Sequence, residues 1–462
     1  MKVLFISHVD SYFSGFVDLI RLLQINGDDP CVLFPASYPN LGLHIDVCRK
    51  ENIRYSAAAS PASTTKSESL LARIKASLSA RSRNAVLAFP GIGYLVHLTI
   101  FSRKLRAIRQ LLHRDKPDLL ALGGDIVGHD MALYIKAGHE LGIPSVLLPG
   151  WMASAREPAE LNLYNPRFFF SRPLNALLGY YAPNWIYTHK GRALVRQPAQ
   201  EACALMTLGL APPLPWVLHS GFADAIAVES EAARKYGIDE GLSSTVLVVT
   251  GSRTHDTLAK WMSDSTKQKV SLCEKLGLDS KKPILLSALP PDLLYALGGR
   301  PSCDFTTYRD LVEFWISSLR HSTDANIIVG LHPSAKRENF SYIETLGASI
   351  SDQPIAELIP VCDYYVASIS ATIQWAIACG KPVINYDVYR YRYTDYLGVK
   401  GVLATEEQDE FRRLLQKMAT DEAFREEIAG FQRADAPRWG ILDGKAGERI
   451  LALFQRMVDR RH

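Results

Sequence analysis

Short apolar runs alternate with amphipathic stretches along almost the whole chain, and this alternation limits the folds that the sequence can adopt. In the first half, runs such as KVLFIS, CVLFP and DLLALGG are separated by helical patterns such as FVDLIRLLQ. Strands that alternate with helices predict a parallel sheet covered by helices on both faces. After Pro212 a second series begins, with the runs VLHSG, TVLVVTG, PILLSALP, NIIVGLHP, YYVAS, PVINYD and GVLA. The sequence therefore predicts two successive α/β units.

The length supports this division, because 462 residues exceed the size at which a single core usually stops growing. Residues 149–215 are rich in aromatics and prolines and show no clean period, so we place the boundary within residues 210–240. We expect an N-terminal domain over residues 1–225 and a C-terminal domain over residues 226–405. The tail over residues 406–462 has helical spacing and could pack back on the first domain.

Composition points to an ordinary globular protein, with 47% hydrophobic residues, 22% charged residues and a mean hydropathy of −0.01. The opening MKVLFISHV is too short an apolar run for a signal peptide and suits a buried first strand, and no run of about 20 apolar residues follows. Seven cysteines without metal-ligand spacing favour a reducing compartment. We therefore expect a cytoplasmic protein.

The net charge of +4 is unevenly placed, because residues 66–116 carry eleven Lys and Arg against Glu68 and Asp115. The apolar residues 95–101 lie within this basic region. One interpretation is peripheral contact with the inner face of a membrane, and the other is a solvated helical face. We expect no nucleic-acid partner.

Two apolar runs of the second half end in polar residues suited to a phosphate. The run IIVGL leads into His332 and Pro333, and a proline biases the preceding residue towards an extended conformation. Ligands of open α/β sheets bind at the carboxyl ends of strands, so His332 could donate to a leaving phosphate. The alternative is a histidine packed at a strand end.

The run YYVAS leads into Ser368, Ser370 and Thr372, where a helix is expected to begin. A helix cap needs one hydroxyl, whereas three hydroxyls suit the oxygens of a phosphate. Simple capping is the alternative. Ser287, in the run PILLSALP, is a further small residue suited to close phosphate approach.

In the first half, the segment DLLALGGDIVGHD places Gly123, Gly124 and Asp125 at a strand end. A carboxylate there could accept the proton of an attacking hydroxyl, although Asp125 could also be a helix cap. Further candidates for the acceptor side are His8, Ser14, Gly15 and His129. We expect the first three of these in the loop between the first strand and the first helix.

The second half resembles bacterial CMP-sugar-dependent transferases of the polysialyltransferase and capsule Kdo transferase type. The His-Pro motif of that family matches His332-Pro333, and its Ser/Thr motif matches residues 368–372. The resemblance implies that both motifs contact the CMP phosphate. The first-half pattern LGGDIVGHDMALYIKAGHELGIPSVLLPG and the later GKPVINY are similar to UDP-N-acetylglucosamine 2-epimerases. Both resemblances imply the α/β GT-B fold: two Rossmann-like, doubly wound parallel-sheet domains facing across a cleft.

The chain departs from the transferase pattern at the acidic motif, in which two acidic residues precede a glycine. The only literal match is Asp239-Glu240-Gly241, in a charged segment ahead of TVLVVTG, and we regard it as coincidence. Asp125 is the better-placed candidate base.

These patterns predict a metal-independent glycosyltransferase that needs no cofactor besides its nucleotide-sugar donor, because the chain has no DxD triplet. The expected donor is a CMP-activated ulosonic acid, sialic-acid-like or Kdo. The expected acceptor is a polysaccharide or lipid-linked acceptor of capsule or lipopolysaccharide biosynthesis. The alternatives are a nucleotide-sugar epimerase or hydrolase of the same fold, and a non-catalytic polysaccharide-assembly protein.

Overall fold

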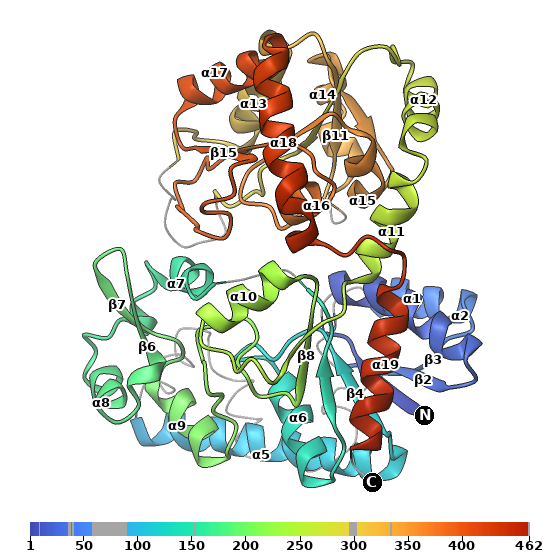
Figure 1. Cartoon of the computed structure of the whole chain (residues 1–462). Coiled ribbons are helices and arrows are strands. Elements are labelled where there is room, and N and C mark those ends of the chain that lie inside the picture. The colour runs from blue at the N-terminus through green and yellow to red at the C-terminus, as the bar shows by residue number, and fades with distance from the viewer. Residues whose placement is uncertain are drawn as a thin grey trace. The chain divides into compact units, whose positions relative to one another are not determined.

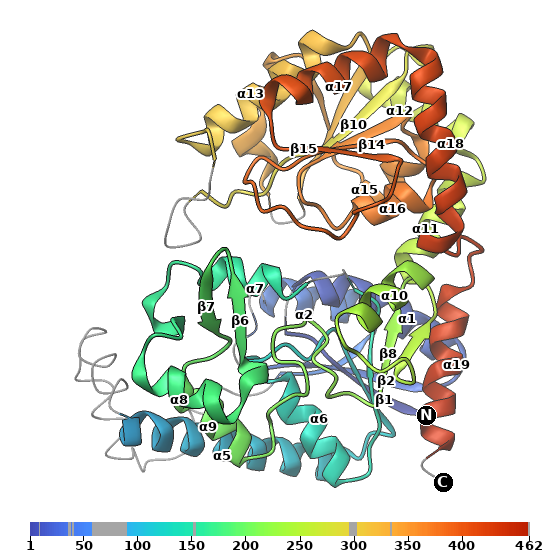
Figure 2. The same cartoon turned by 60° about the vertical axis from the view of Figure 1, so that its left-hand side comes forward.

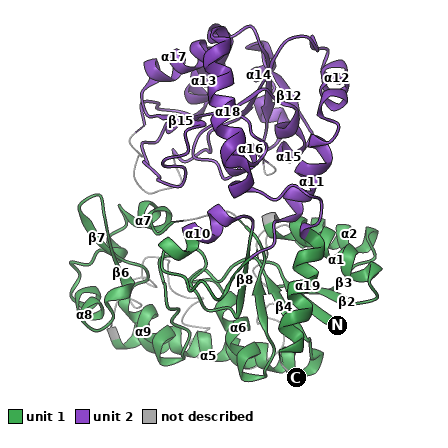
Figure 3. Cartoon of the chain, in the orientation of Figure 1, with its two compact units in different colours: residues 1–228, 237–248, 447–462 green, residues 229–236, 249–446 purple. Residues whose placement is uncertain are grey.

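The computed structural model describes residues 1–8, 10–35, 38, 41–57, 90–150, 154–294, 303–332 and 335–460. They form two compact units, coloured separately in Figure 3. The first unit comprises residues 1–228, 237–248 and 447–462, and the second comprises residues 229–236 and 249–446. Neither unit is therefore one continuous stretch of the chain, and the tail expected over residues 406–462 is divided between the two units.

The first unit is built on a seven-stranded parallel sheet with the order β3-β2-β1-β4-β5-β8-β9 (Figure 1). Its strands are β1 (Lys2–Ile6), β2 (Asp29–Phe34), β3 (Arg54–Ala57), β4 (Leu119–Leu122), β5 (Ser145–Leu147), β8 (Ala225–Val228) and β9 (Leu247–Val249). Its helices are α1 (Asp10–Ile25), α2 (Leu41–Lys50), α5 (Pro90–Asp115), α6 (Met131–Glu140), α7 (Arg156–Asn162), α8 (Pro173–Tyr181), α9 (Ala199–Thr207) and α19 (Ala446–Asp459). An antiparallel hairpin of β6 (Ile186–His189) and β7 (Arg192–Val195) lies outside this sheet, and α10 (Glu231–Asp239) contains residues of both units.

One strand prediction in this region is wrong, and one predicted strand belongs to the other sheet. The run VLHSG, residues 217–221, forms bends rather than a strand. Nearby prolines lack the N–H that a ladder needs, and the N–H of Ser220 donates to the carboxylate of Asp125 instead of to a strand. The run TVLVVTG does contain a strand, β9, but this strand completes the first sheet rather than opening the second.

The last helix, α19, supplies part of the first unit's core. Ile450, Leu453 and Phe454 of α19 are fully buried in the same hydrophobic cluster as Phe5 of β1 and Phe16 of α1. Their spacing places them on one face of the helix, as expected for a helix that covers a sheet. The end of the chain is thus a structural part of the unit that contains its beginning.

The second unit is built on a six-stranded parallel sheet with the order β12-β11-β10-β13-β14-β15. Its strands are β10 (Ile284–Ala288), β11 (Asn326–Gly330), β12 (Ser349–Ser351), β13 (Tyr364–Ala367), β14 (Val383–Tyr386) and β15 (Val402–Thr405). Its helices are α11 (Arg253–Met262), α12 (Ser265–Leu276), α13 (Tyr308–Ser322), α14 (Tyr342–Thr345), α15 (Ile355–Leu358), α16 (Ile373–Ala378), α17 (Gln408–Thr420) and α18 (Glu422–Trp439). Figure 2 shows α13 and α17 on one side of this sheet and α15 and α16 on the other.

Adjacent residues of β13 face opposite sides of this sheet, as the pleat of a strand requires. Tyr364 belongs to the cluster that contains Trp315 of α13 and Phe411 of α17. The hydroxyl of Tyr365 instead bonds Thr372, just before α16. Both tyrosines are almost completely buried.

The order of the strands identifies one ligand-binding edge in each unit. In the first sheet the winding reverses between β1 and β4, and in the second sheet it reverses between β10 and β13. Such reversal points leave a crevice beyond the carboxyl ends of the two central strands, where open α/β sheets bind ligands. The segments after β1, β4, β10 and β13 are therefore the places to look for a site.

The basic region expected over residues 66–116 is described only from residue 90 onward. The C-terminal half of α5 carries part of its charge, but Lys104 pairs with Asp130 at 2.7 Å and Arg109 pairs with Glu140. Among the helices of the described residues, none has the length and apolar character to cross a bilayer. Membrane contact stays a prediction.

We expect Gly123→Ala to destabilise the first unit. A Cβ at position 123 would lie 2.3 Å from the ring of Tyr12, which must then move within a packed core. Such overpacking typically lowers the free energy of unfolding by about 1–3 kcal/mol.

Gly15→Ala is the matched control, because Gly15 has nothing within 4 Å of the added carbon and lies exposed in α1. It should raise the free energy of unfolding by roughly 0.5–1 kcal/mol through helix propensity. Urea unfolding of both variants checks the contact, and a wild-type midpoint for Gly123→Ala would show that Tyr12 does not pack there.

Candidate functional site

The hydroxyls of Tyr365, Thr372 and Ser370 form a row of hydrogen bonds at the carboxyl end of β13 in the second unit. We call residues 368–372, which follow this strand, the hydroxyl loop. The Oγ of Ser370 lies 2.7 Å from Oγ1 of Thr372, which in turn lies 2.5 Å from the hydroxyl oxygen of Tyr365. The loop is thus tied to the interior of the sheet through a buried tyrosine.

Helix capping does not explain these hydroxyls. Thr372 is the N-cap residue of α16, but its side chain makes no cap hydrogen bond. The Oγ of Ser370 accepts from the N–H of Thr372 at 3.3 Å, which is a local turn contact. Because α16 has only six residues, its dipole is no evidence for an anion site. The inference that an anion binds here rests on the hydroxyls.

The hydroxyl loop has a strained backbone at Ile369, whose φ is 44°. A β-branched residue in the left-handed region costs about 1–2 kcal/mol, so its surroundings must hold it there. The side-chain oxygen of Asn385, in β14, accepts from the N–H of Ile369 at 3.1 Å. Strain maintained in this way is typical of ligand-binding loops.

Ser368 begins the hydroxyl loop and is 1% exposed, yet its Oγ has no hydrogen-bond partner among the described residues. Leaving a buried hydroxyl unsatisfied costs about 1–3 kcal/mol, and most native structures avoid it. A ligand oxygen at the sheet edge would remove this cost. The hydroxyls of Ser370 and Thr372 contact each other, whereas that of Ser368 does not bond them, and binding of a donor phosphate by these three residues stays a prediction.

His332 lies two residues beyond the end of β11 and is exposed, and its carbonyl oxygen accepts from the N–H of Ala335 at 2.8 Å. Strand β10 separates β11 from β13, so His332 and the hydroxyl loop follow strands two positions apart at the same edge of the sheet. Pro333 lies outside the described residues. Contact of either residue with a donor stays a prediction.

Ser287 has a partner in the core. Its Oγ, fully buried, accepts from Nε1 of Trp315 at 2.8 Å. A bond to a donor phosphate would compete with this interaction, so the geometry favours a structural function for the Ser287 side chain.

In the first unit, Asp125 follows β4 and is 1% exposed. One carboxylate oxygen accepts from the N–H of Ser220 at 2.6 Å and the other from the N–H of Phe222 at 2.9 Å. Burial raises the pKa of Asp125, while His219 and these two N–H groups oppose the rise. Asp125 therefore anchors the segment after residue 218 and does not cap a helix.

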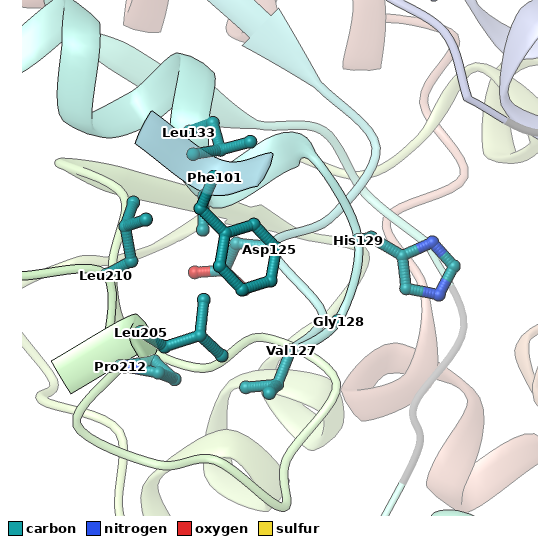
Figure 4. Close-up of a pocket in the computed structure, with 10 residues that line it drawn as sticks. Phe101, Asp125, Val127, Gly128, His129, Leu133, Leu205, Leu210 and Pro212 are labelled. Atoms are coloured by element: carbon teal, nitrogen blue, oxygen red, sulfur yellow. The ribbon is translucent and has the colours of Figure 1, made fainter. Parts of the chain in front are cut away.

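A small hollow lies beside Asp125, lined mainly by apolar side chains that include Phe101, Leu205 and Leu210 (Figure 4). It has room for about one water molecule and none for a sugar. Figure 4 shows the imidazole of His129 pointing away from these apolar side chains. The hollow is thus part of the packing around Asp125.

Two histidines meet at the reversal point of the first sheet. His8 follows β1, and its ring centroid lies 5.2 Å from that of His129 and 5.2 Å from that of Tyr12. Loss of hydration and then the neighbouring His129 lower the pKa of His8 to about 4. Burial and then Arg196 lower the pKa of His129, although the residue as a whole is exposed. Both imidazoles are therefore neutral at pH 7 and able to accept a proton.

Nδ1 of His8 is buried and has no hydrogen-bond partner among the described residues. Ser14 and Gly15, expected in the same loop, instead lie exposed in the second turn of α1, because this helix already begins at Asp10. Of the residues predicted for the acceptor side, the structure brings His8 and His129 together.

Sequence reasoning missed Tyr365 and Asn385, which hold the hydroxyl loop. A signal existed for Tyr365, since a tyrosine in a fully buried strand needs a partner for its hydroxyl. No comparable signal marks Asn385. In the described part of the chain, no group of three or more His, Cys, Asp or Glu side chains is arranged to hold a metal ion.

Solved structures match the chain along its whole length at low sequence identity. The UDP-GlcNAc 2-epimerase of Neisseria meningitidis bound to UDP-GlcNAc is 14% identical, with 99% of this chain and 100% of that chain covered and a TM-score of 0.53. The UDP-GlcNAc 2-epimerase of Methanocaldococcus jannaschii in complex with UDP-GlcNAc and UDP is 12% identical, with 99% and 100% covered and a TM-score of 0.50. The glycotransferase of kitacinnamycin is 14% identical, with 99% of each chain covered and a TM-score of 0.51.

No protein-family model and no curated protein matches the chain. The structural matches establish the fold: the chain has two parallel-sheet α/β domains of the GT-B type, as the sequence predicted.

We expect His8 and His139 to titrate on opposite sides of the ordinary histidine pKa of 6.5. The pKa of His8 is lowered to about 4, whereas a hydrogen bond to Asp224 raises the pKa of His139. NMR of the imidazole signals as a function of pH measures both pKa values. The variants His8→Gln and His139→Gln identify which signal belongs to which histidine.

The sign for stability follows from the direction of the shift. Between pH 4 and 6.5 the unfolded chain binds a proton at His8 that the folded chain does not, so His8 makes folding less favourable as the pH falls through this window. His8→Gln should reduce this acid loss of stability. A His8 signal that titrates near 6.5 would contradict the burial that the structure gives it.

Proposed function

We propose that the chain is a glycosyltransferase of the GT-B fold whose second unit binds a nucleotide-sugar donor and whose first unit binds the acceptor. The observation that carries this proposal is the hydroxyl loop. It combines a buried Ser368 hydroxyl without a partner among the described residues, the strained Ile369 and the paired hydroxyls of Ser370 and Thr372. All of these lie at the reversal point of the sheet, where donors aimed at a phosphate are best placed.

The chemistry of this loop suits a leaving phosphate. When a sugar leaves its nucleotide, negative charge grows on the phosphate oxygens, and fixed O–H donors stabilise that charge more in the transition state than before it. We assign the same function to His332, an exposed residue at the same edge of the sheet. We propose that these donors, and not a metal ion, neutralise the leaving group.

For the donor we propose a CMP-activated ulosonic acid, because His332-Pro333 and residues 368–372 resemble the two phosphate motifs of CMP-sugar-dependent transferases. The acceptor would be a surface polysaccharide or a lipid-linked glycan, made at the cytoplasmic side with the basic α5 near the membrane. UDP-GlcNAc is the rival donor, since two structural neighbours were solved with it.

Two rival functions use the same fold. The epimerase neighbours make a nucleotide-sugar epimerase or hydrolase the second candidate, which would release free or isomerised sugar without a glycoside. A non-catalytic polysaccharide-assembly protein would bind no nucleotide. Incubation of the protein with each nucleotide sugar and a glycan acceptor, followed by mass analysis of the products, distinguishes the three.

An acceptor hydroxyl needs a base, and the candidates are Asp125 and His8. Both oxygens of Asp125 already accept backbone N–H groups, whereas Nδ1 of His8 accepts none from the described residues. The lowered pKa of His8 keeps the imidazole neutral at pH 7, so Nδ1 is available for a proton, and the same shift makes it a weaker base than an ordinary histidine. We therefore propose His8 as the base and keep Asp125 as the alternative.

We expect the hydroxyl loop to dominate nucleotide affinity. Titration of CMP, UDP, GDP and CDP by calorimetry should find one that binds, and Ser370→Ala/Thr372→Ala should raise its dissociation constant at least ~10-fold. The control is Ser263→Ala/Thr420→Ala, which removes two exposed hydroxyls of the second unit that bond only local carbonyls. An unchanged constant in the loop variant would refute the assignment.

We expect His8→Gln to lose turnover and Asp125→Asn to lose stability. His8→Gln removes the base and should lower turnover by about 10² or more, with donor affinity and stability at pH 7.5 retained. Asp125→Asn turns an amide NH2 towards a backbone N–H and should cost roughly 1–3 kcal/mol of stability. If Asp125→Asn instead keeps its stability and loses turnover while His8→Gln stays active, then Asp125 is the base.

A further inference from the structure

The hydroxyl loop is held from inside the protein by a tyrosine that cannot itself touch a ligand. Tyr365 lies in β13 between β10 and β14, paired with Leu286 and Val383, and is 0% exposed. Its hydroxyl oxygen lies 2.5 Å from Oγ1 of Thr372. Burial raises the pKa of Tyr365, so the hydroxyl keeps its proton at any physiological pH.

The direction of the row of hydroxyls depends on which of Tyr365 and Thr372 donates to the other. If Tyr365 donates to Thr372, then Thr372 has its own proton left for Ser370, at 2.7 Å. The Oγ of Ser370 also accepts from the N–H of Thr372. A serine hydroxyl has two acceptor positions and one proton, so Ser370, which is half-buried, is left with a proton to donate outward.

We propose that Tyr365 is a positioning residue that aims the hydroxyls of Thr372 and Ser370 so that the outer one donates to an anionic ligand. This inference deepens the proposed function and rests on it for the nature of the ligand, a phosphate of a nucleotide. Hydrogen bonds in a row polarise one another, which strengthens the outermost donor. Donors already aimed at the anion need no reordering when it binds.

Two further contacts fix the backbone of the same loop. The hydroxyl of Tyr396 donates to the carbonyl oxygen of Ser370 at 3.1 Å, and Asn385 accepts from the N–H of Ile369 at 3.1 Å. These contacts hold the main chain, whereas Tyr365 is the one described residue outside the hydroxyl loop that bonds one of its side-chain hydroxyls. Removal of the Tyr365 hydroxyl should therefore disturb the direction of the donors and leave the course of the loop unchanged.

The chain supplies a matched control one residue away. Tyr364 is equally buried in the same strand, faces the opposite side of the sheet, and bonds Oγ1 of Thr323 at 3.0 Å. Tyr364→Phe and Tyr365→Phe each remove one oxygen from one buried, hydrogen-bonded tyrosine. Any difference between them in ligand binding must come from what the lost hydroxyl contacts.

The test measures CMP and UDP binding by calorimetry and thermal stability for both variants. Tyr365→Phe should raise the dissociation constant of the bound nucleotide at least ~5-fold, while Tyr364→Phe stays within about twofold at a similar loss of thermal stability. Thr372→Val, which keeps the side-chain shape and breaks the row one step further out, should weaken binding at least as much. It also tests the row if Tyr365→Phe does not fold.

A double-mutant cycle separates positioning from general destabilisation. If Tyr365 acts through Thr372, the variant Tyr365→Phe/Thr372→Val should bind no more weakly than Thr372→Val alone, because the link is already broken. Additive effects, or equal losses in Tyr364→Phe and Tyr365→Phe, would overturn the inference.

Failure of the proposed function gives a different pattern. If Ser370→Ala/Thr372→Ala weakens binding and Tyr365→Phe does not, the donor site stands and the inference about Tyr365 is wrong. If the wild type binds none of the nucleotides, the proposed function is wrong. Titration of the same variants with inorganic phosphate then tests separately whether Tyr365 positions the hydroxyls. Equal phosphate binding by wild type and Tyr365→Phe, or none by either, then refutes the inference.

Discussion

The parallel pairing of β10 with β11 on one side and β13 on the other is the interaction on which the candidate site depends. Parallel strands all end at the same edge, and the winding reverses between β10 and β13, so helices cannot cover both strand ends there. The polar groups beyond these ends must find partners outside the ladder. The hydroxyl loop does so through Tyr365, Asn385 and Tyr396, all residues of the surrounding framework.

Much of the fold was predictable because buried parallel strands appear in the sequence as continuous apolar runs. KVLFIS, DLLALGG, NIIVGLHP and YYVAS all contain strands at the expected places. Two features were not predictable by this means. An apolar run such as VLHSG can lie in a turn when its N–H groups are taken by a distant carboxylate, and nothing local in TVLVVTG says which sheet it joins. Both depend on contacts between residues far apart in the sequence.

For the candidate site, too, local features could be predicted from the sequence and long-range contacts could not. Strand ends and hydroxyl-rich turns are local, so His332, Ser368, Ser370 and Thr372 could be named from the sequence. Their partners could not, with the exception of Tyr365, which lies only seven residues from Thr372. Asp125 bonds a residue 95 positions away, and His8 meets His129, which follows the neighbouring strand β4 but lies far from His8 in the sequence. Sequence thus locates candidate groups, whereas the hydrogen bonds that decide what each can do come from tertiary structure.

The place of α19 in the first unit has a consequence for how the chain folds during synthesis. The hydrophobic cluster around β1 includes Ile450, Leu453 and Phe454, which leave the ribosome more than 400 residues after β1 itself. Domains normally fold in the order in which they emerge. Here the second unit, complete by residue 446, has all its residues before the first unit does. A ribosome stalled before α19 would therefore present a first unit with one apolar surface uncovered, a natural substrate for chaperones.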